Sequence, residues 1–338
     1  MREFDLIARI AARSGRDASA HPGAAARSSP SPARGSAPSG IILGIGDDAA
    51  VLEPTPGMRL VATTDTLVHG IHYPPATPPA DIGWKALAVN LSDLAAMAAT
   101  PRWALLSLTL PAVHEDWTER FLDGWCALAD ASGIALVGGD TTRGPEAIGV
   151  TVLGEVASGA ALARSGAVAG DRVWVSGTLG DAAAALRWSP GPQPGLPPQA
   201  LRQRLHRPSP RLALGRALRG IATACIDVSD GLLADLGHVC RASGVAAELQ
   251  LSALPASDAL SALLSAEQRW PLQLTGGDDY ELCFTAPESR DAELAALSAD
   301  LGLRLTAIGR IGVGSGVRVL RDDGRAYDVP RPGYEHFA

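Results

Sequence analysis

Aspartates are the residues of this chain whose type and spacing could do chemistry. The run LGIGDDAAVL at 43–52 places Asp47 and Asp48 side by side in a glycine-rich, apolar stretch. Buried carboxylates are costly unless they are paired or bind a cation. Acids beside small or apolar residues recur along the chain, at Asp47-Asp48, Asp65, Asp93, Asp140, Asp227 with Asp230, and Asp278-Asp279.

Each cluster taken alone has a structural interpretation, since an Asp before a helix is commonly an N-cap and Gly-Gly-Asp is commonly a turn. If several clusters converge, repulsion costs about 4 kcal/mol per close pair at an intermediate effective dielectric, and bound cations would have to offset it. Oxygen ligands without cysteine favour Mg²⁺ or Ca²⁺ over zinc. Carboxylate-bound Mg²⁺ usually shares its coordination shell with substrate phosphates.

Other motifs exclude several kinds of site. The sequence has no G-x-x-x-x-G-K-[ST], and Lys85, the only lysine, is not in a glycine loop, so a P-loop is excluded. The segment 227–231 is not an EF-hand loop, because His238 stands where the twelfth-position glutamate belongs. Lys85 is as well explained by a solvated helix position as by a functional one. The glycines of 312–316 predict a hairpin turn.

Strand and helix patterns alternate around these acids. Asp93 lies inside a helical pattern, with Asn90 one turn earlier on the same face. The alternation predicts an α/β fold in two halves with a joint near 156–170, although it does not give the order of the strands. The predicted strands are 59–68, 102–110, 134–139, 147–156, 171–177, 224–229, 280–286 and 304–311, and the predicted helices are 79–99, 114–132, 209–220, 230–243 and 292–302.

Composition narrows the class of protein. The 338 residues are enough for about two domains, and the net charge of −7 argues against nucleic acid as a partner. The four cysteines are scattered without a C-x-x-C pair, so neither a zinc site nor a disulfide framework is expected. Neither a signal peptide nor a membrane-spanning stretch is evident, which predicts a cytoplasmic protein. Residues 12–40 read as a flexible insertion and 189–198 as an exposed loop.

Several stretches, in order and over nearly the whole chain, resemble the thiamine-monophosphate kinase family. This family belongs to a superfamily that also includes aminoimidazole ribonucleotide synthetase and selenophosphate synthetase. The stretches that carry the resemblance are EFDLIAR, GIGDDAAVL, TTDTLVHGIHY, KALAVNLSDLAAMAATP, VGGDTTRGP, ALARSGAVAGD, IDVSDGLLADLGH, GGDDYELCF and GYEHF.

The resemblance implies a mixed α/β, two-domain aminoimidazole ribonucleotide synthetase-like fold whose N-terminal sheet pairs across a homodimer. Residues 1–156 would bind ATP and Mg²⁺ and dimerise, and residues 157–338 would form a C-terminal α/β domain that completes the active site. The implied activity is ATP-dependent phosphorylation of thiamine monophosphate to thiamine diphosphate, assisted by several Mg²⁺ ions. The number of these ions and any monovalent-cation requirement stay open.

The resemblance also implies roles for individual residues. No catalytic residue is expected beyond the metal ligands, because the acceptor is a phosphate oxygen that is already anionic near neutral pH. Asp278 stands where the family usually has glutamate, and its shorter carboxylate puts direct substrate contact there in question. The implied metal ligands are Asp48, Thr63, Thr64, Asp65, Asp93, Asp140, Asp227 and Asp230; ATP would contact Gly139, Asp140, Arg164 and Ser229; thiamine monophosphate would contact His72, Asp278 and Tyr334.

Two arginines, Arg164 and Arg143, flank the acidic loops and could bind phosphate bidentately. Two alternatives to the kinase remain. One is another ATP-using synthetase of the superfamily, although the chain lacks the N-terminal reactive cysteine of a selenophosphate synthetase. The other is a non-catalytic protein that binds nucleotide or divalent ions.

Overall fold

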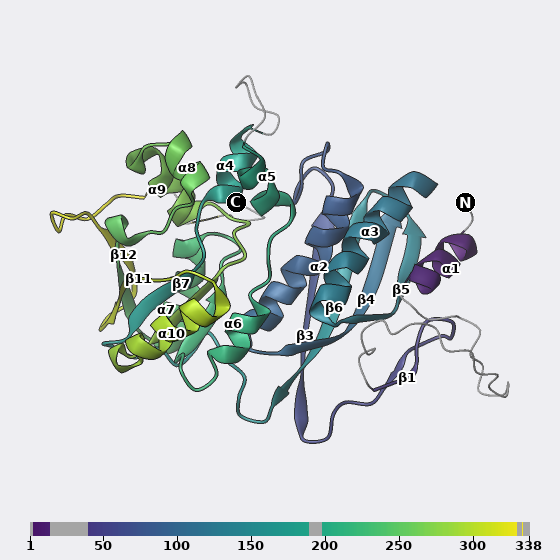
Figure 1. Ribbon diagram of the computed structural model, residues 1–338, viewed down its shortest axis with the longest axis horizontal. Coiled ribbons are helices and arrows are strands. Elements are labelled where there is room, and N and C mark those ends of the chain that lie inside the picture. The colour runs from purple at the N-terminus through teal and green to yellow at the C-terminus, as the bar shows by residue number, and fades with distance from the viewer. Residues whose placement is uncertain (1–2, 14–39, 189–197, 330–332, 334–338) are drawn as a thin grey trace. The chain divides into compact units, whose positions relative to one another are not determined.

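The computed structural model describes residues 3–13, 40–188, 198–329 and 333 (Figure 1). Nearly all of the predicted insertion at 12–40, most of the 189–198 loop, and Tyr334 lie outside the described residues. The chain divides into two compact units, Met1–Asn90 with Pro101–Glu155 and Leu91–Thr100 with Val156–Ala338. Among the helices that the structure describes, none is both long and apolar enough to cross a membrane.

The first unit is built around a four-stranded sheet in the order β3-β6-β4-β5. Strands β4 and β5 are parallel, and their register sets Ser107 opposite Asp140. The two short strands β1 and β2 pair with each other in antiparallel fashion. The elements are α1 (Glu3–Arg13), β1 (Ile41–Leu43), β2 (Val51–Leu52), β3 (Met58–Val68), α2 (Pro79–Ala96), β4 (Thr100–Leu110), α3 (Glu115–Ser132), β5 (Ala135–Arg143) and β6 (Ala147–Ala157), the last residues of α2 being grouped with the second unit.

One face of this sheet is covered by α2 and α3 (Figure 1). Burial in β6 alternates from residue to residue, with Ile148, Val150 and Val152 fully buried. This period of two is what a strand with one apolar face requires. Helix α3 buries its Phe121 and Trp125 side, and exposed acids lie elsewhere on it. The sheet therefore has one packed face and one open face.

The second unit holds a six-stranded sheet in the order β12-β9-β11-β7-β10-β8. Only β12 and β9 form a parallel pair among the registers described; the other pairs are antiparallel. The elements are β7 (Arg172–Ser176), α4 (Asp181–Trp188), α5 (Gln199–His206), α6 (Leu212–Ala217), β8 (Ala224–Asp227), α7 (Leu232–Ser243), β9 (Ala246–Gln250), α8 (Asp258–Leu263), α9 (Ala266–Thr275), β10 (Leu282–Ala286), α10 (Asp291–Leu301), β11 (Leu305–Gly312) and β12 (Gly316–Leu320), with 3₁₀ turns at Leu251–Ala253 and Glu288–Arg290.

Both faces of this second sheet are packed. Val173 and Val175 of β7 lie in a core with α7, whereas Trp174 between them packs into a different core. Trp174 stacks on Phe284 of β10, with 6.4 Å between the ring centroids. The apolar runs in β7 and β10 follow from this burial, because a strand covered on both faces has no solvent side.

The α/β class is confirmed, and a helix or strand lies at each predicted position, but the helix predicted at 209–220 is confined to Leu212–Ala217 and the strand predicted at 224–229 ends at Asp227. Three other expectations are also corrected. The strand predicted at 134–139 continues to Arg143, so Asp140 lies inside β5 and not after its end. The glycines of 312–316 do not form a hairpin turn, because β12 pairs with β9 and not with the preceding β11. Lys85 is not a solvated residue, since only 1% of it is exposed.

Candidate functional site

A cavity of about 1130 Å³ lies on the open face of the sheet in the first unit. Its walls come from α1, the 45–52 segment and all four strands of the sheet. The sequence-predicted site residues that line it are Asp48, Thr64, Gly139 and Asp140. Residues more than 90 positions apart in sequence, with metal-binding or nucleotide-binding roles implied for each, therefore share one cavity.

The two aspartates of the 43–52 stretch are both exposed and both line this cavity. The Asp48 backbone N–H donates to the carboxylate of Asp47 at 2.9 Å, next to Gly46 with its φ of 120°. Asp47 therefore already accepts one hydrogen bond from its own loop, and the loop presents both carboxylates to the cavity.

Strand β3 divides its predicted ligands between two faces. Thr64 lines the cavity, but Thr63 and Asp65 do not, because alternate side chains of a strand point to opposite faces. The Thr64 hydroxyl donates to the Val150 carbonyl at 3.2 Å and accepts from the Thr151 hydroxyl at 2.9 Å. Thr63 and Asp65 are half-buried on the other face. This cavity therefore gathers only one of the three predicted ligands of β3.

His72 is held by the turn that follows β3. Its Nδ1 accepts the Val68 backbone N–H at 2.9 Å, and its carbonyl accepts from the Lys85 ammonium at 3.0 Å. An ammonium inside a protein must find polar partners to offset lost hydration. The buried lysine of α2 thus fixes the backbone at His72, a role for which the sequence pattern gave no signal.

In the second unit, helix α2 contributes a polar contact to strand β8. The Ser92 hydroxyl donates to the Asp227 carboxylate at 2.7 Å, and both side chains are buried. Asp93, the next residue on α2, is half-buried. Asp227 is the last residue of β8, so the strand predicted at 224–229 ends two residues early and leaves this acid at the strand's end.

Asp235 organises the loop after β8 and was missed by the sequence interpretation. One oxygen of its carboxylate accepts three backbone N–H groups, from Ser229, Asp230 and Gly231, at 3.0 to 3.1 Å. The loop that carries two predicted site residues is thereby fixed from the first turn of α7. An acid in a first helical turn is a common N-terminal signal, which could have identified it.

The pKa of Asp235 is raised to about 7, chiefly by burial and then by the charge of Asp230. Because the unfolded carboxyl loses its proton near its ordinary value of 3.8, the folded state binds the proton more tightly. We expect the free energy of unfolding to fall as the pH rises from about 4 to about 7, by about 1 kcal/mol per pH unit at the steepest. Denaturant unfolding of the Asp235→Asn variant without divalent ions should show a flatter pH dependence; equal slopes in the two proteins would contradict this.

The GGDDY segment lies against the loop after β8. The Asp278 N–H donates to the Ser229 carbonyl at 2.9 Å and the Tyr280 N–H to the Val228 carbonyl at 2.8 Å. Asp278 and Tyr280 have φ values of 69° and 49°, in the left-handed region. Asp tolerates that region better than residues with longer side chains. The backbone thus brings Ser229 and Asp278 together and favours the Asp found here.

Arg164 and Arg143 can be located in the structure, whereas Tyr334 lies outside the described residues. Arg164 is exposed, and its carbonyl accepts from the Ser243 hydroxyl at 3.3 Å. Burial lowers the pKa of His238, and the charges of Arg241 and then Arg164 lower it further. Arg143 is the exposed last residue of β5. Tyr334 cannot be placed, although a Cβ on the preceding Gly333 would lie 2.9 Å from the Asp230 carbonyl.

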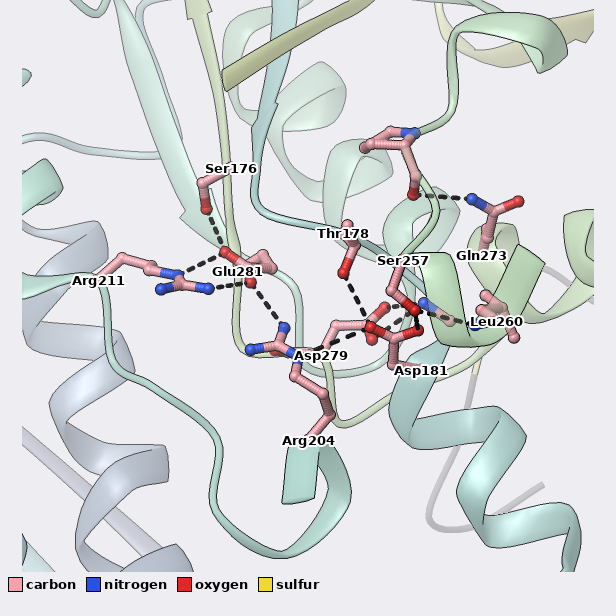
Figure 2. A network of polar contacts seen from close by, with 12 residues as sticks. Ser176, Thr178, Asp181, Arg204, Arg211, Ser257, Leu260, Gln273, Asp279 and Glu281 are labelled. Atoms are coloured by element: carbon pink, nitrogen blue, oxygen red, sulfur yellow. Dashed lines mark hydrogen bonds and ion pairs between the residues drawn. The ribbon is translucent and has the colours of Figure 1, made fainter. Parts of the chain in front are cut away.

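The acids that follow Asp278 are buried (Figure 2). Asp279 accepts the Gly180 N–H with both carboxylate oxygens, at 2.9 and 3.0 Å, and burial raises its pKa well above the ordinary value. Glu281 is fully buried and paired with Arg204 and Arg211. The second aspartate of the Asp278-Asp279 cluster is therefore part of the interior and not a ligand at the surface.

The donors at the cavity suit magnesium in chemical type. Asp48 and Asp140 supply carboxylate oxygens and Thr64 a hydroxyl, and Mg²⁺ prefers hard oxygen ligands. Among the described residues no three His, Cys, Asp or Glu side chains are close enough to hold a metal by themselves.

Comparison with known proteins agrees with the two-domain α/β fold. Residues 46–156 match the AIR synthase related protein N-terminal domain, and residues 168–322 match the C-terminal domain of the same family. A thiamine-monophosphate kinase of Salmonella typhimurium is 46% identical over 301 residues, which cover 87% of this chain and 92% of that protein.

Solved structures give the same result. The crystal structure of thiamine-monophosphate kinase from Stenotrophomonas maltophilia K279a is 49% identical, with a TM-score of 0.82 and coverage of 97% of this chain and 98% of that one. AaThiL complexed with AMPPCP and TMP is 36% identical, with a TM-score of 0.74 and coverage of 87% and 92%. The resemblance in the sequence motifs is confirmed, and the chain belongs to the AIR synthase related family, among its thiamine-monophosphate kinases.

Proposed function

We propose that this chain transfers the γ-phosphoryl group of ATP to the phosphate of thiamine monophosphate, giving thiamine diphosphate and ADP. The observation that carries this is the identity of 46 to 49% with thiamine-monophosphate kinases over nearly the whole chain. A relative complexed with AMPPCP and TMP supports the two substrates. The bond that forms joins an acceptor phosphate oxygen to the γ-phosphorus, and the bond to the β-phosphate oxygen breaks.

The chemistry requires positioning and charge neutralisation more than a strong base. The acceptor oxygen is already anionic near neutral pH, so the protein need not remove a proton from it. Phosphoryl transfer proceeds with little covalent participation by protein groups. A site rich in carboxylates and poor in histidine is consistent with this demand, and no general base is assigned.

We infer that Mg²⁺ binds to carboxylate and hydroxyl oxygens of this chain. Bound Mg²⁺ would neutralise charge on the ATP phosphates and on the acceptor. Asp48, Asp140 and Thr64 would approach it from the cavity of the first unit, and Ser92 would hold the Asp227 carboxylate in one orientation. The full proposed set is Asp48, Thr63, Thr64, Asp65, Asp93, Asp140, Asp227 and Asp230.

The nucleotide and acceptor contacts are proposed on the same basis. Residues 1–156 would bind Mg²⁺ and ATP, and residues 157–338 would supply the remaining groups. The backbone bond from Asp278 to Ser229 supports a common location for a substrate contact and a nucleotide contact. ATP would contact Gly139, Asp140, Arg164 and Ser229, and thiamine monophosphate would contact His72, Asp278 and Tyr334.

The experiment that tests the function is a direct product assay. Purified protein is incubated with ATP and Mg²⁺, with and without thiamine monophosphate, and thiamine diphosphate is measured by chromatography. We expect diphosphate only when both substrates are present, and none after EDTA. Nucleotide binding without diphosphate would favour the alternatives, a non-catalytic relative or another ATP-using synthetase of the superfamily.

Asp278 offers a specific test of acceptor binding. Asn tolerates left-handed backbone as Asp does, so Asp278→Asn removes the charge and leaves the local conformation suited to its φ of 69°. We expect the KM for thiamine monophosphate to rise about tenfold, the scale of one lost charge-assisted hydrogen bond. Asp300→Asn, at an exposed position near the end of α10, is the matched control. An unchanged KM would remove Asp278 from the acceptor site.

We also propose that the chain forms a homodimer through its N-terminal β3-β6-β4-β5 sheet. Leu60 and Leu105 on that sheet are 51% and 37% exposed, and large exposed apolar side chains are common at interfaces between subunits. We expect Leu60→Asp, at a position outside the cavity lining, to shift the protein from dimer to monomer in sedimentation equilibrium. Leu263→Asp, at a 38% exposed position of α8, should leave the dimer intact. A cytoplasmic location completes the proposal.

A further inference from the structure

A buried carboxylate between two arginines follows Asp278 by three residues in the chain. Glu281 accepts from Arg204 at 2.6 Å and from Arg211, whose Nε is 2.6 Å from Oε2 and whose other nitrogen contacts Oε1 (Figure 2). The Ser176 hydroxyl donates to the same carboxylate at 2.5 Å. We call these four residues, Glu281, Arg204, Arg211 and Ser176, the Glu281 clamp.

The clamp holds a backbone that would not keep its shape unaided. Tyr280, directly before Glu281, and Asp278 both have left-handed φ values, which non-glycine residues adopt only where the surroundings determine them. Asp279 between them is fixed by the Gly180 N–H, and its carbonyl accepts from Arg204 at 3.2 Å. Strained backbone of this kind is concentrated at functional sites.

The same segment is hydrogen-bonded to the loop after β8. The Val228 N–H donates to the Glu281 carbonyl, the Tyr280 N–H to the Val228 carbonyl, and the Asp278 N–H to the Ser229 carbonyl. Each of these bonds is 2.8 to 2.9 Å long. A displacement of Glu281 therefore moves Asp278, and through these bonds it also moves Ser229.

The guanidinium groups of both arginines pair with Glu281 and are therefore poorly placed to bind a ligand. Arg204 and Arg211 have side chains only 20% and 19% exposed, and both are directed at Glu281. Removing one partner of a buried ion pair leaves an uncompensated charge. Arg204 comes from α5 and Arg211 precedes α6, so two separate helices are fastened to the GGDDY segment.

We propose that Arg204 and Arg211 are positioning residues for the phosphoryl transfer, acting through Glu281 to hold Asp278 and Ser229 in place. This inference rests on the proposed kinase function. The arginines touch neither substrate; they fix the carboxylate, the carboxylate fixes the GGDDY backbone, and that backbone fixes two residues with proposed substrate contacts.

The test compares Arg211→Met with Arg211→Lys and with Arg310→Met, an exposed arginine of the same unit that pairs with Glu288. Steady-state kinetics give kcat and KM for both substrates, and hydrogen exchange followed by mass spectrometry reports on peptides covering 276–284. We expect Arg211→Met to lower kcat/KM for thiamine monophosphate tenfold or more and to speed amide exchange in 276–284. Arg211→Lys should lie between it and the wild type, since lysine keeps the charge but not the two-nitrogen geometry. Arg310→Met should change neither readout.

Two results would overturn the proposal. If exchange in 276–284 is unchanged while KM rises, Arg211 binds a phosphate directly; if neither changes, the clamp plays no part. Should Arg211→Met fail to fold, the lysine variant alone decides, because it must still speed exchange in 276–284. The exchange readout needs no turnover, so a wild-type protein that makes no thiamine diphosphate would refute the kinase function and still leave the clamp testable.

Discussion

Asp140→Asn should lower kinase turnover about 100-fold or more while the protein stays folded. Asp140 lies on β5 opposite Ser107 and lines the same cavity as Asp48, so its carboxylate is presented on the open face of the sheet. Asparagine has nearly the same shape but lacks the negative charge that an oxygen-coordinated cation requires. The loss should therefore fall on metal binding and turnover.

Two measurements distinguish a loss of metal binding in Asp140→Asn from a loss of stability. Thermal unfolding of the wild type should shift upward when Mg²⁺ is added, through mass action, and the shift should shrink in the variant. Without Mg²⁺ the two proteins should unfold at similar temperatures. Asp116→Asn, at an exposed position on α3, is the matched control and should keep full activity. If Asp140→Asn retained turnover within about threefold, a metal role for this residue would be wrong.

The acids at Asp48 and Asp140 could be predicted from the sequence because their signal is local. A carboxylate beside glycines next to an apolar strand is visible in a short window, and repetition of that pattern strengthens it. The structure adds that Asp48 and Asp140 share a cavity with Thr64. The structure also shows that Thr64 faces the cavity and that Thr63 and Asp65 do not, although the sequence predicted the same role for all three. Alternate residues of a strand point to opposite faces of the sheet.

The supporting residues could not be predicted, because their roles depend on long-range contacts. Lys85 bonds to His72, 13 positions away, and Glu281 bonds to Arg211, 70 positions away. The hydrophobic pattern of a single helix or strand carries no information about side-chain contacts with a distant segment. Asp235 is the exception, since its position in a helical first turn is a local signal that was overlooked.

The errors in the predicted strands and turns also arise from contacts between residues far apart in the sequence. The glycines of 312–316 suit a hairpin turn, yet β12 crosses to pair with β9. Strand pairing is decided by which edges are available in the assembled sheet, and turn composition reports only on the local chain. The strand predicted to end at Gly139 continues because β4 supplies partners as far as Arg143.

Gly139→Ala should destabilise the first unit by about 3 to 5 kcal/mol and remove most activity. The φ of Gly139 is 154°, and a Cβ there would lie 1.9 Å from the Leu106 carbonyl oxygen of the neighbouring strand. Backbone atoms of a central strand cannot move aside as a flexible side chain can. Relief of the overlap would push β5 away from β4 at the residue before Asp140.

Gly133→Ala is the control that isolates this effect. Gly133 also has a left-handed φ, 67°, at the end of α3, but a Cβ there would meet nothing within 4 Å. Gly133→Ala should lower the free energy of unfolding by about 1 kcal/mol, the cost of placing a residue with a Cβ in left-handed backbone, and should retain activity. Both free energies come from denaturant unfolding, and both activities come from the diphosphate assay. If the two variants lost equal stability, the close approach of β5 to β4 would not be what requires glycine at 139, and the position of Asp140 would have to be maintained by other contacts.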